Sequence, residues 1–424
     1  MAPFRSAVFG DLNLAALCGA AGRHRTIANV LVNSSANIYD VVIAGAGPAG
    51  ASAAIHLAQR GARVLLAEQK KFPRAKLCGE FISPECLTHF EQLGVAAKMN
   101  AAGGAPLTQT VFYSRAGRSV SVPSEWFGNQ NAALGLSRAE MDHRLLVRAR
   151  EAGVEVLEET LASRLLRDGE RVTGISLKSG DIIRNANAPL VIDATGRTRA
   201  LVRRFEGQRI KSSRQHPSLV AFKAHLEGAQ VAAGTCEIYF YPGGYGGLSS
   251  VENGLSNLCF IASAADVRAC QADAETVMRQ IVMKNSRAAR TLAQARAQGE
   301  WLAVTLDSFG RREPVPAEGL LMIGDAAAFI DPFTGSGMLM ALEGGELAAS
   351  VIMRHLPGLR NGASFKALAQ DYRTSYKQLF GSRLRICAVL RRAAFVPRLA
   401  SVAIRLFGAS VGARRALAQA TRKG

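Results

Sequence analysis

The stretch Tyr39-Asp-Val-Val-Ile-Ala-Gly-Ala-Gly-Pro-Ala-Gly50 decides the fold of this 424-residue chain. Its β-branched first half, bounded by a glycine cluster, predicts a strand over Tyr39–Ala44. Helix-forming residues then fill Ala51–Arg60, and a second apolar run, Ala62–Ala67, ends at Glu68. A strand, a tight turn, a helix and a second strand within about 30 residues predict a βαβ unit.

The glycines of this turn predict a dinucleotide site. Because the turn follows a strand and opens a helix, its backbone N–H groups and the positive helix end can face a pyrophosphate, and the missing Cβ atoms allow close approach. Glu68, at the end of the second strand, can accept both ribose hydroxyl protons of an adenosine. The residues predicted to contact the pyrophosphate are Gly45, Gly47, Pro48, Ala49 and Gly50.

Further elements complete an α/β pattern. Ser137 and Glu140 form a capping box for a helix that ends at Ala152. Strands are predicted at residues 154–157, 190–193 and 320–323, a hairpin at 172–184, and a helix from about Ser336. Residues 108–122 and 219–262 alternate like antiparallel strands, so they predict a second, β-rich domain that the first one interrupts.

Two late motifs carry a family resemblance. Leu-Leu-Met-Ile-Gly324-Asp325 and Asp331-Pro332-Phe-Thr-Gly335-Ser336-Gly337 resemble the FAD-binding end of the p-hydroxybenzoate-hydroxylase-like flavoproteins. The resemblance implies that Asp325 holds the ribitol and that Pro332, Gly335, Ser336 and Gly337 cradle the flavin ring. A helix that starts near Ser336 suits the negative charge of a reduced flavin.

The same resemblance covers two further pieces of the chain. Asp193-Ala-Thr-Gly196 is similar to the middle motif of the superfamily, near which FAD and NAD(P)H both pass. Arg138 resembles the arginine at the FAD phosphates, although a solvated residue at a helix start is the alternative. The resemblance therefore implies FAD as cofactor and NAD(P)H as electron donor.

The segment Phe72-Pro-Arg-Ala-Lys-Leu-Cys-Gly-Glu-Phe-Ile-Ser-Pro84 resembles the geranylgeranyl-reductase-like branch. There this loop lies against the flavin face, and Arg74 or Lys76 would neutralise cofactor phosphate. Cys78 is a redox-active candidate, or it is a small residue that packs there.

The substrate motif departs from that branch. Tyr245 is kept in Tyr241–Val251, but the tryptophan and the Phe-Pro pair are lost, and the halogenase Trp-x-Trp-x-Ile-Pro is missing. We predict a lipophilic substrate contacted by Tyr245, Leu248 and Phe333, hydroxylated on an aromatic or polyketide-like ring. The alternative reaction is reduction of isoprenoid double bonds. The alternative without enzyme activity is a membrane-binding module that keeps the flavoprotein fold.

These motifs predict an α/β fold, α+β overall. A Rossmann-like FAD domain is made of three discontinuous segments, and a mixed or antiparallel β-sheet forms the substrate domain. The predicted ranges are an extension over 1–38, the FAD domain over 39–98, 137–204 and 318–380, the substrate domain over 99–136 and 205–317, and a basic helical tail over 381–424.

Charge is concentrated in that tail. The chain has 52 basic and 33 acidic residues, and ten basic and no acidic residues follow residue 380. Arg391, Arg398 and Arg405 are seven apart, so a helix would carry them on one stripe that suits an anionic membrane, and a solvated helix packed on the FAD domain is equally compatible. Aromatic residues do not interleave with the basic ones, which disfavours nucleic acid.

The seven cysteines contain no Cys-x-x-Cys pair, so no disulfide framework and no metal site are predicted. A reducing cytoplasm is the expected compartment, with contact to the inner face of the membrane through the tail. No uninterrupted apolar run approaches the roughly 20 residues that span a bilayer.

Overall fold

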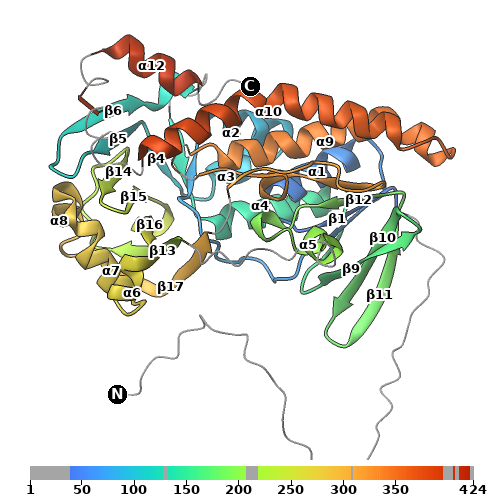
Figure 1. The fold of residues 1–424 in the computed structure, drawn as a ribbon, viewed down its shortest axis with the longest axis horizontal. Helices are drawn as coiled ribbons and strands as arrows, with labels where there is room; N and C mark the ends of the chain where they lie inside the picture. The colour runs from blue at the N-terminus through green and yellow to red at the C-terminus, as the bar shows by residue number, and fades with distance from the viewer. Residues whose placement is uncertain are drawn as a thin grey trace, which may run out of the picture.

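A computed structural model describes residues 39–127, 132–206, 218–306, 309–331, 333, 335–394, 404–405 and 410–420. Two layered bodies lie side by side in it, one built on a parallel sheet and the other on a larger mixed sheet (Figure 1). The predicted extension over residues 1–38 and the predicted flavin contact Pro332 lie outside the described residues.

The parallel sheet has the strand order β19-β12-β1-β2-β8. All four of its neighbouring pairs are parallel, and β1 lies in the middle, where Val41 pairs with both Leu190 and Val64. The α/β fold predicted from the sequence is confirmed. Its strands are β1 (Val41–Ala44), β2 (Val64–Ala67), β8 (Glu155–Leu157), β12 (Leu190–Asp193) and β19 (Leu320–Met322).

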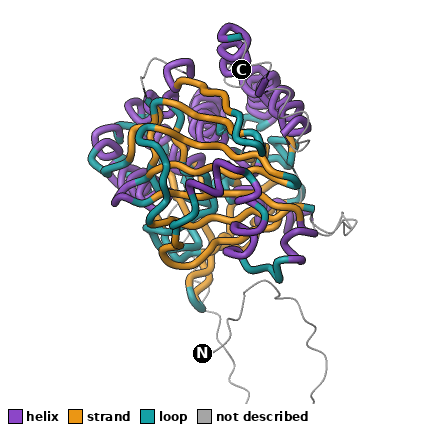
Figure 2. The backbone as a smooth tube through the Cα atoms, turned by 90° about the vertical axis from the view of Figure 1, so that its left-hand side faces the viewer, coloured by secondary structure: helices purple, strands orange, loops and turns teal. Residues whose placement is uncertain are grey.

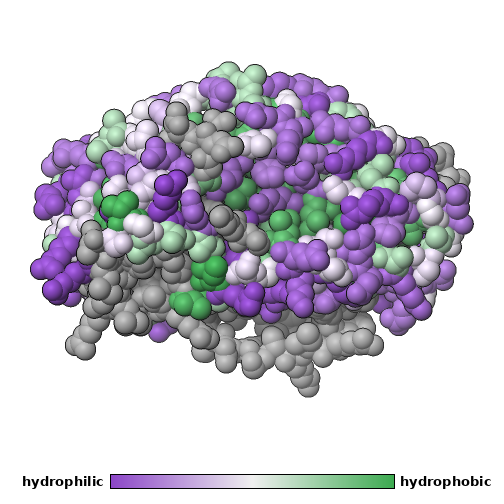
Figure 3. Space-filling view, turned by 90° about the horizontal axis from the view of Figure 1, so that it is seen from above, coloured by the Kyte–Doolittle hydropathy of each residue, from purple (hydrophilic) through white to green (hydrophobic). Residues whose placement is uncertain are grey.

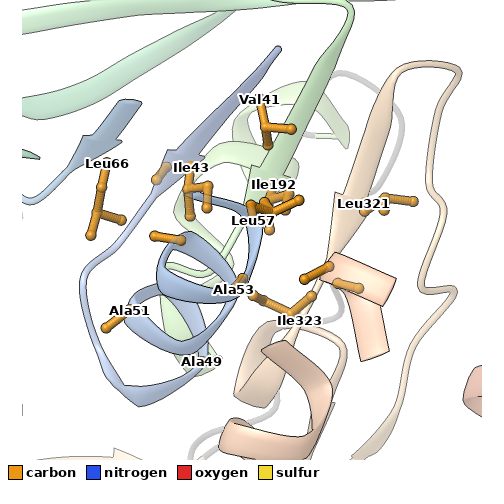
Figure 4. Packing of buried hydrophobic residues seen from close by; sticks show 14 of the residues in the cluster. Val41, Ile43, Ala49, Ala51, Ala53, Leu57, Leu66, Ile192, Leu321 and Ile323 are labelled. Carbon is orange, nitrogen blue, oxygen red and sulfur yellow. The ribbon is translucent and has the colours of Figure 1, made fainter. Parts of the chain in front are cut away.

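Two helices pack on one another beside this sheet, α1 (Pro48–Gln59) and α9 (Gly337–Arg360). Their approach is close, because a Cβ atom on Gly345 would lie only 2.6 Å from the carbonyl oxygen of Ala49. Ile43, Leu57 and Ile192 lie near one another between α1 and the strands (Figure 4), and each is fully buried. The apolar runs of the sequence thus become one continuous core.

The second sheet has the order β17-β13-β16-β15-β14-β5-β6 and is antiparallel except where β14 meets β5. Its helical side is covered by α6 (Ala264–Ala269), α7 (Ala274–Gln280) and α8 (Ser286–Thr291). Its other side faces the parallel-sheet body. The strands are β5 (Gln109–Tyr113), β6 (Ser119–Pro123), β13 (Leu219–Glu227), β14 (Thr235–Tyr241), β15 (Gly244–Ser250), β16 (Ser256–Ser263) and β17 (Arg296–Leu306).

Smaller elements connect or extend these bodies. The predicted capping box is present at α4 (Arg138–Glu151), where the Ser137 side chain accepts a hydrogen bond from the Glu140 N–H. The predicted hairpin is also present and belongs to a three-stranded sheet that projects at the lower right of Figure 1. Figure 2 shows strands running through the middle of the molecule with helices around them. The remaining elements used below are β3 (Phe81–Ile82), β7 (Ala133–Gly135), β9 (Leu161–Asp168), β10 (Arg171–Ser179) and β11 (Ile182–Asn187).

The basic tail does not begin as a separate element. Helix α10 (Lys366–Ala394) runs through residue 381, and Arg383 on it is 2% exposed and paired with Glu343. That arginine is therefore not available to a membrane. The side chains of Arg391 and Arg398 lie outside the described part of the chain, whereas Arg405 is exposed.

The end of the chain returns to the second sheet. Helix α12 (Val411–Ala420) contacts the edge strand β6 and the short helix η1 (Ser124–Phe127). Arg414 donates a hydrogen bond of 3.0 Å to the Ser121 carbonyl, and its guanidinium lies over the Trp126 ring. Ile404 belongs to the buried apolar cluster that includes Tyr245. The part of the tail that is described thus packs on the protein.

The outer surface is mostly polar. On the face seen in Figure 3, hydrophilic side chains surround small groups of apolar ones. Among the described helices, none is long and apolar enough to span a bilayer.

Candidate cofactor and substrate site

The glycine turn before α1 leaves an open place at the helix start. Gly45 has φ +101°, and a Cβ atom there would lie 2.4 Å from the Ala194 carbonyl oxygen, while one on Gly50 would lie 1.9 Å from the Gly45 oxygen. These two glycines are needed for backbone packing. A Cβ atom on Gly47 would meet only Arg138 Nη2, at 3.9 Å, so the turn is open to a ligand there.

Glu68 lies beside this turn at the end of β2. One of its carboxylate oxygens accepts a hydrogen bond of 3.0 Å from the Ala46 N–H and the other accepts one of 3.0 Å from the Lys70 N–H. The carboxylate is thus held in the position that the sequence analysis assigned to a ribose acceptor. Its binding of a ribose stays a prediction.

Two arginines share one carboxylate next to Gly47. Arg138 makes two hydrogen bonds of 2.8 Å to Asp142, and Arg74 makes one of 3.0 Å to the same residue. Burial would lower the pKa of Arg138, but the Asp142 carboxylate outweighs burial and raises it. Arg74, Arg138 and Asp142 together carry a net charge of about +1 where a diphosphate would lie.

Lys76 and Asp325 complete this charged group from opposite ends of the sequence. Desolvation lowers the pKa of Lys76, and the positive charges of Arg74 and Arg138 lower it further. Burial raises the pKa of Asp325, while Arg138 and Lys76 act against that rise. These predicted residues, from distant stretches of chain, therefore lie within electrostatic reach of one another.

The start of α9 forms another open edge. Ser336 is the residue before the helix, Gly335 has φ +59°, and a Cβ atom on Gly337 would meet nothing within 4 Å. Gly324 has φ +56°, and a Cβ atom there would lie 2.8 Å from the Ala49 side chain. A small cavity adjoins this edge and is lined by Gly324, Asp325, Ala328, Ile330, Gly337, Met340, Gly344, Tyr376 and Phe380.

Asp193 does not join the site, contrary to the prediction. It is fully buried, and its carboxylate accepts hydrogen bonds from Thr195 N at 2.9 Å, Thr195 Oγ1 at 2.6 Å and Val202 N at 3.2 Å. The side chain is consumed in shaping its own turn, which Gly196, at φ +76°, continues. Ala194 next to it packs against Gly45 and Gly50, so the motif supports the glycine turn from behind.

Cys78 lies half-buried between the two bodies. Its sulfur accepts a hydrogen bond of 3.4 Å from the Glu80 N–H and interacts with the Arg138 guanidinium. Its carbonyl accepts one of 3.1 Å from Asn257 on β16. The loop that resembles the reductase branch thus touches both the charged cofactor edge and the second sheet.

The sheet side that faces this loop changes from aromatic to charged across its strands. Phe333 lies 5.5 Å from Tyr245, 5.6 Å from Phe240 and 6.0 Å from Phe112 between ring centroids. The Tyr245 hydroxyl donates to the buried carboxylate of Asp331, so its polar end is satisfied inside the protein. The aromatic half therefore forms an apolar cluster of rings on this sheet side.

Leu248 is not part of this side, and its prediction as a substrate contact is wrong. Side chains alternate along a strand, so Tyr245 and Leu248 of β15 point to opposite sides of the sheet. Leu248 is fully buried in the core beneath α6, α7 and α8.

The charged half of the sheet side was missed by the sequence analysis. Glu80, fully buried, binds Lys223 at 2.5 Å and His225 at 2.7 Å, both on β13. Lys223 and His225 are two residues apart in a strand whose intervening residues are apolar, and that alternation is the pattern that could have placed them on one side.

The chain matches one family model and several known proteins. The model, described as "FAD binding domain", matches residues 38–373. Digeranylgeranylglycerophospholipid reductase 2 of Methanopyrus kandleri is 28% identical over 344 residues, which cover 78% of this chain and 81% of that protein. The flavin-dependent brominase Bmp2 has a similar fold, with a TM-score of 0.76, 22% identity and coverage of 91% of this chain and 94% of the other.

A geranylgeranyl bacteriochlorophyll reductase-like protein of Thermoplasma acidophilum also shares the fold, with a TM-score of 0.73, 20% identity and coverage of 90% of this chain and 96% of the other. The open backbone at Gly47 and Gly337 and the cationic group beside Gly47 fit a diphosphate-containing flavin. The chain therefore belongs to the FAD binding domain family and is an FAD-dependent oxidoreductase.

Proposed function

We propose that this enzyme reduces isolated carbon–carbon double bonds of a lipophilic, isoprenoid-like substrate. The observation that carries the proposal is the sheet side on which aromatic rings and a buried charged cluster lie side by side. Apolar rings suit an alkene chain, and a buried cluster can hold the proton that alkene reduction consumes. The relatives named as isoprenoid lipid reductases support the same substrate class.

FAD fits the site through groups on four segments. Backbone N–H groups after Gly47 would hold the diphosphate together with Arg138 and Arg74, and Glu68 would accept the ribose hydroxyls. The start of α9 would face the flavin ring. When bound, FAD supplies the hydride, and we propose NAD(P)H as the donor that reduces it.

The aromatic side chains have a separate task, which is to bind the chain of the substrate and exclude water. Phe112, Phe240 and Phe333 present apolar surface, and the Tyr245 hydroxyl is engaged with Asp331. Such a wall stabilises an apolar ligand by about 25 cal/mol for each Å² removed from water. It does not select a head group.

Hydroxylation of an aromatic or polyketide-like ring is the second candidate. The missing tryptophan and Phe-Pro pair around Tyr245 favour it, because the sequence there differs from the reductase motif. The two candidates differ in one requirement, since hydroxylation consumes O2 and alkene reduction does not.

The deciding experiment measures NADPH oxidation and product mass with geranylgeranyl lipid and with a phenolic lipid, with and without oxygen. We expect lipid-dependent NADPH oxidation without oxygen and a product heavier by two hydrogens. A product heavier by one oxygen, formed only in air, would establish the hydroxylase instead. Phe333→Ala should raise KM for the lipid while FAD remains bound.

We also propose that the enzyme works at the cytoplasmic face of a membrane, where an isoprenoid lipid partitions. Arg405, Arg414 and Arg415 give the described end of the chain a basic character. Each basic side chain near an anionic surface contributes about 1 kcal/mol. Arg414 donates a hydrogen bond to the Ser121 carbonyl. Contact of Arg414 with a membrane must therefore compete with the docking of α12 on the protein.

A further inference from the structure

We propose that Glu80, Lys223 and His225 form a proton-delivery cluster for the alkene reduction, an inference that rests on the function proposed above. Reduction of a double bond needs a proton as well as a hydride, and the reduced cofactor supplies the hydride. The cluster lies on the sheet side where the substrate is proposed to bind.

The members of the cluster are joined by hydrogen bonds to Glu80. One Glu80 oxygen accepts from Lys223 Nζ at 2.5 Å and from the Arg138 N–H at 2.8 Å, and the other is 2.7 Å from His225 Nε2. Glu80 is 0% exposed, the Lys223 side chain is 3% exposed and the His225 side chain is 23% exposed. A continuous set of hydrogen bonds therefore joins a buried ammonium to a group that reaches solvent.

The register of the strands places this cluster next to the aromatic wall. Ile238, Gly247, Cys259 and Lys223 are neighbours in one row across β14, β15, β16 and β13. Two strand spacings, about 10 Å, separate Gly247 from Lys223. A Cβ atom on Gly247 would lie 3.2 Å from Ile238 Cδ1, so a ligand over this row would contact Ile238 and Cys259 before it reaches Lys223.

Other charged and titratable groups border the cluster. Cys78 lies on the same loop as Glu80, Cys259 lies beside Lys223 on β16, and Arg138 begins α4. Burial of the carboxyl opposes ionisation, but His225 and Lys223 outweigh it and lower the pKa of Glu80. The carboxylate is thus charged in the resting cluster and holds its two partners in line.

A structural purpose alone does not explain this composition. Burying an ion pair gives little stability relative to apolar residues of the same volume, and removing one partner is costly. Glu80 also has φ +53°, a left-handed conformation that non-glycine residues rarely adopt. Strain and buried charge on one residue between two bodies indicate a functional role.

The alkene gains a hydride at one carbon and a proton from the Lys223 ammonium at the other, so it is reduced by two electrons while the cofactor is oxidised by two. The neutral amine regains its proton from His225 through Glu80, and His225 takes a proton from solvent. Lys223 is the group that would touch the substrate, and Glu80 and His225 act through it.

The test compares two electron acceptors on anaerobically reduced holoenzyme. Flavin oxidation is followed near 450 nm with geranylgeranyl lipid, which needs a delivered proton, and with ferricyanide, which does not. We expect Lys223→Met to slow the lipid reaction at least 100-fold and to leave the ferricyanide reaction within twofold. His225→Asn should slow the lipid reaction most at high pH, with partial rescue by added imidazole.

Folding is controlled with a charge-balanced variant. Lys223→Met alone leaves Glu80 without its ammonium partner, so its thermal midpoint should fall, whereas Glu80→Gln with Lys223→Met removes both charges and should regain stability and FAD content. The double variant still lacks the Lys223 ammonium, so its lipid reduction should stay as slow as that of Lys223→Met. Wild-type lipid reduction in the double variant, or equal losses with both acceptors, would overturn the cluster proposal alone. A wild-type enzyme that reduces no lipid, while ferricyanide oxidises its flavin, would overturn both proposals.

Discussion

A comparison of Gly47→Ala with Gly50→Ala separates cofactor binding from folding. The two glycines lie three residues apart in one turn, but a methyl group meets different surroundings at each. At Gly47 the nearest atom would be Arg138 Nη2 at 3.9 Å, which is ordinary contact. At Gly50 it would be the Gly45 carbonyl oxygen at 1.9 Å, which requires the backbone to move.

The magnitudes follow from these contacts. Gly47→Ala should leave the fold intact and cost about one charge-assisted hydrogen bond to the diphosphate, about 1.5–3 kcal/mol. That loss weakens FAD binding roughly 10- to 100-fold. Gly50→Ala should destabilise the protein by about 1–3 kcal/mol through overpacking, whether or not FAD is present.

The assay is calorimetric titration of FAD into protein stripped of flavin, with thermal unfolding of the stripped protein measured in parallel. Gly47→Ala should change the affinity and leave the unfolding midpoint of the stripped protein unchanged. Gly50→Ala should lower that midpoint. Unchanged FAD affinity in Gly47→Ala would refute the assignment of this turn to the diphosphate.

Three further predictions address other parts of the structure. Cys78→Ala should retain most lipid reduction, because loss of a half-buried sulfur leaves only a small cavity, and a dead variant with full FAD content would show that the thiol takes part in the chemistry. Burial alone would raise the pKa of Asp40, but Arg360 and Arg63 lower it to about 2. Asp40→Asn should therefore cost about 1 kcal/mol above pH 4, measured by urea unfolding, and this difference should shrink as the pH falls from 4 through 2. Truncation after Ala394 should abolish binding to anionic vesicles at low salt and keep the flavin, and equal binding by both proteins would exclude the tail as the contact.

Much of the fold was predictable because it depends on local pattern. The run 39–50 has a period and glycine spacing that allow few structures, and the strand at 190–193 was predicted with its observed bounds. Pairings between distant segments had no such local pattern. Nothing near Glu80 in the sequence indicates that its partners are Lys223 and His225.

The errors have physical causes as well. Leu248 was grouped with Tyr245 because the two are close in sequence, but strand alternation sends them to opposite sides. Asp193 matched a motif, but its hydrogen bonds turn inward to Thr195 and Val202. A motif therefore predicts the path of the backbone better than it predicts the hydrogen-bond partners of a carboxylate.

The strand order of the parallel sheet also limits when the enzyme can form during synthesis. Strand β1 can pair with β2 early, but residue 41 waits for its second partner at residue 190, and β12 waits for its own second partner near residue 320. At about 5–20 residues per second, a ribosome takes roughly 15–65 s to reach the last of these strands. Until then the glycine turn lacks the sheet that holds it, and α9 has yet to be made. A complete FAD site therefore forms only after α9 has been made, near the end of translation.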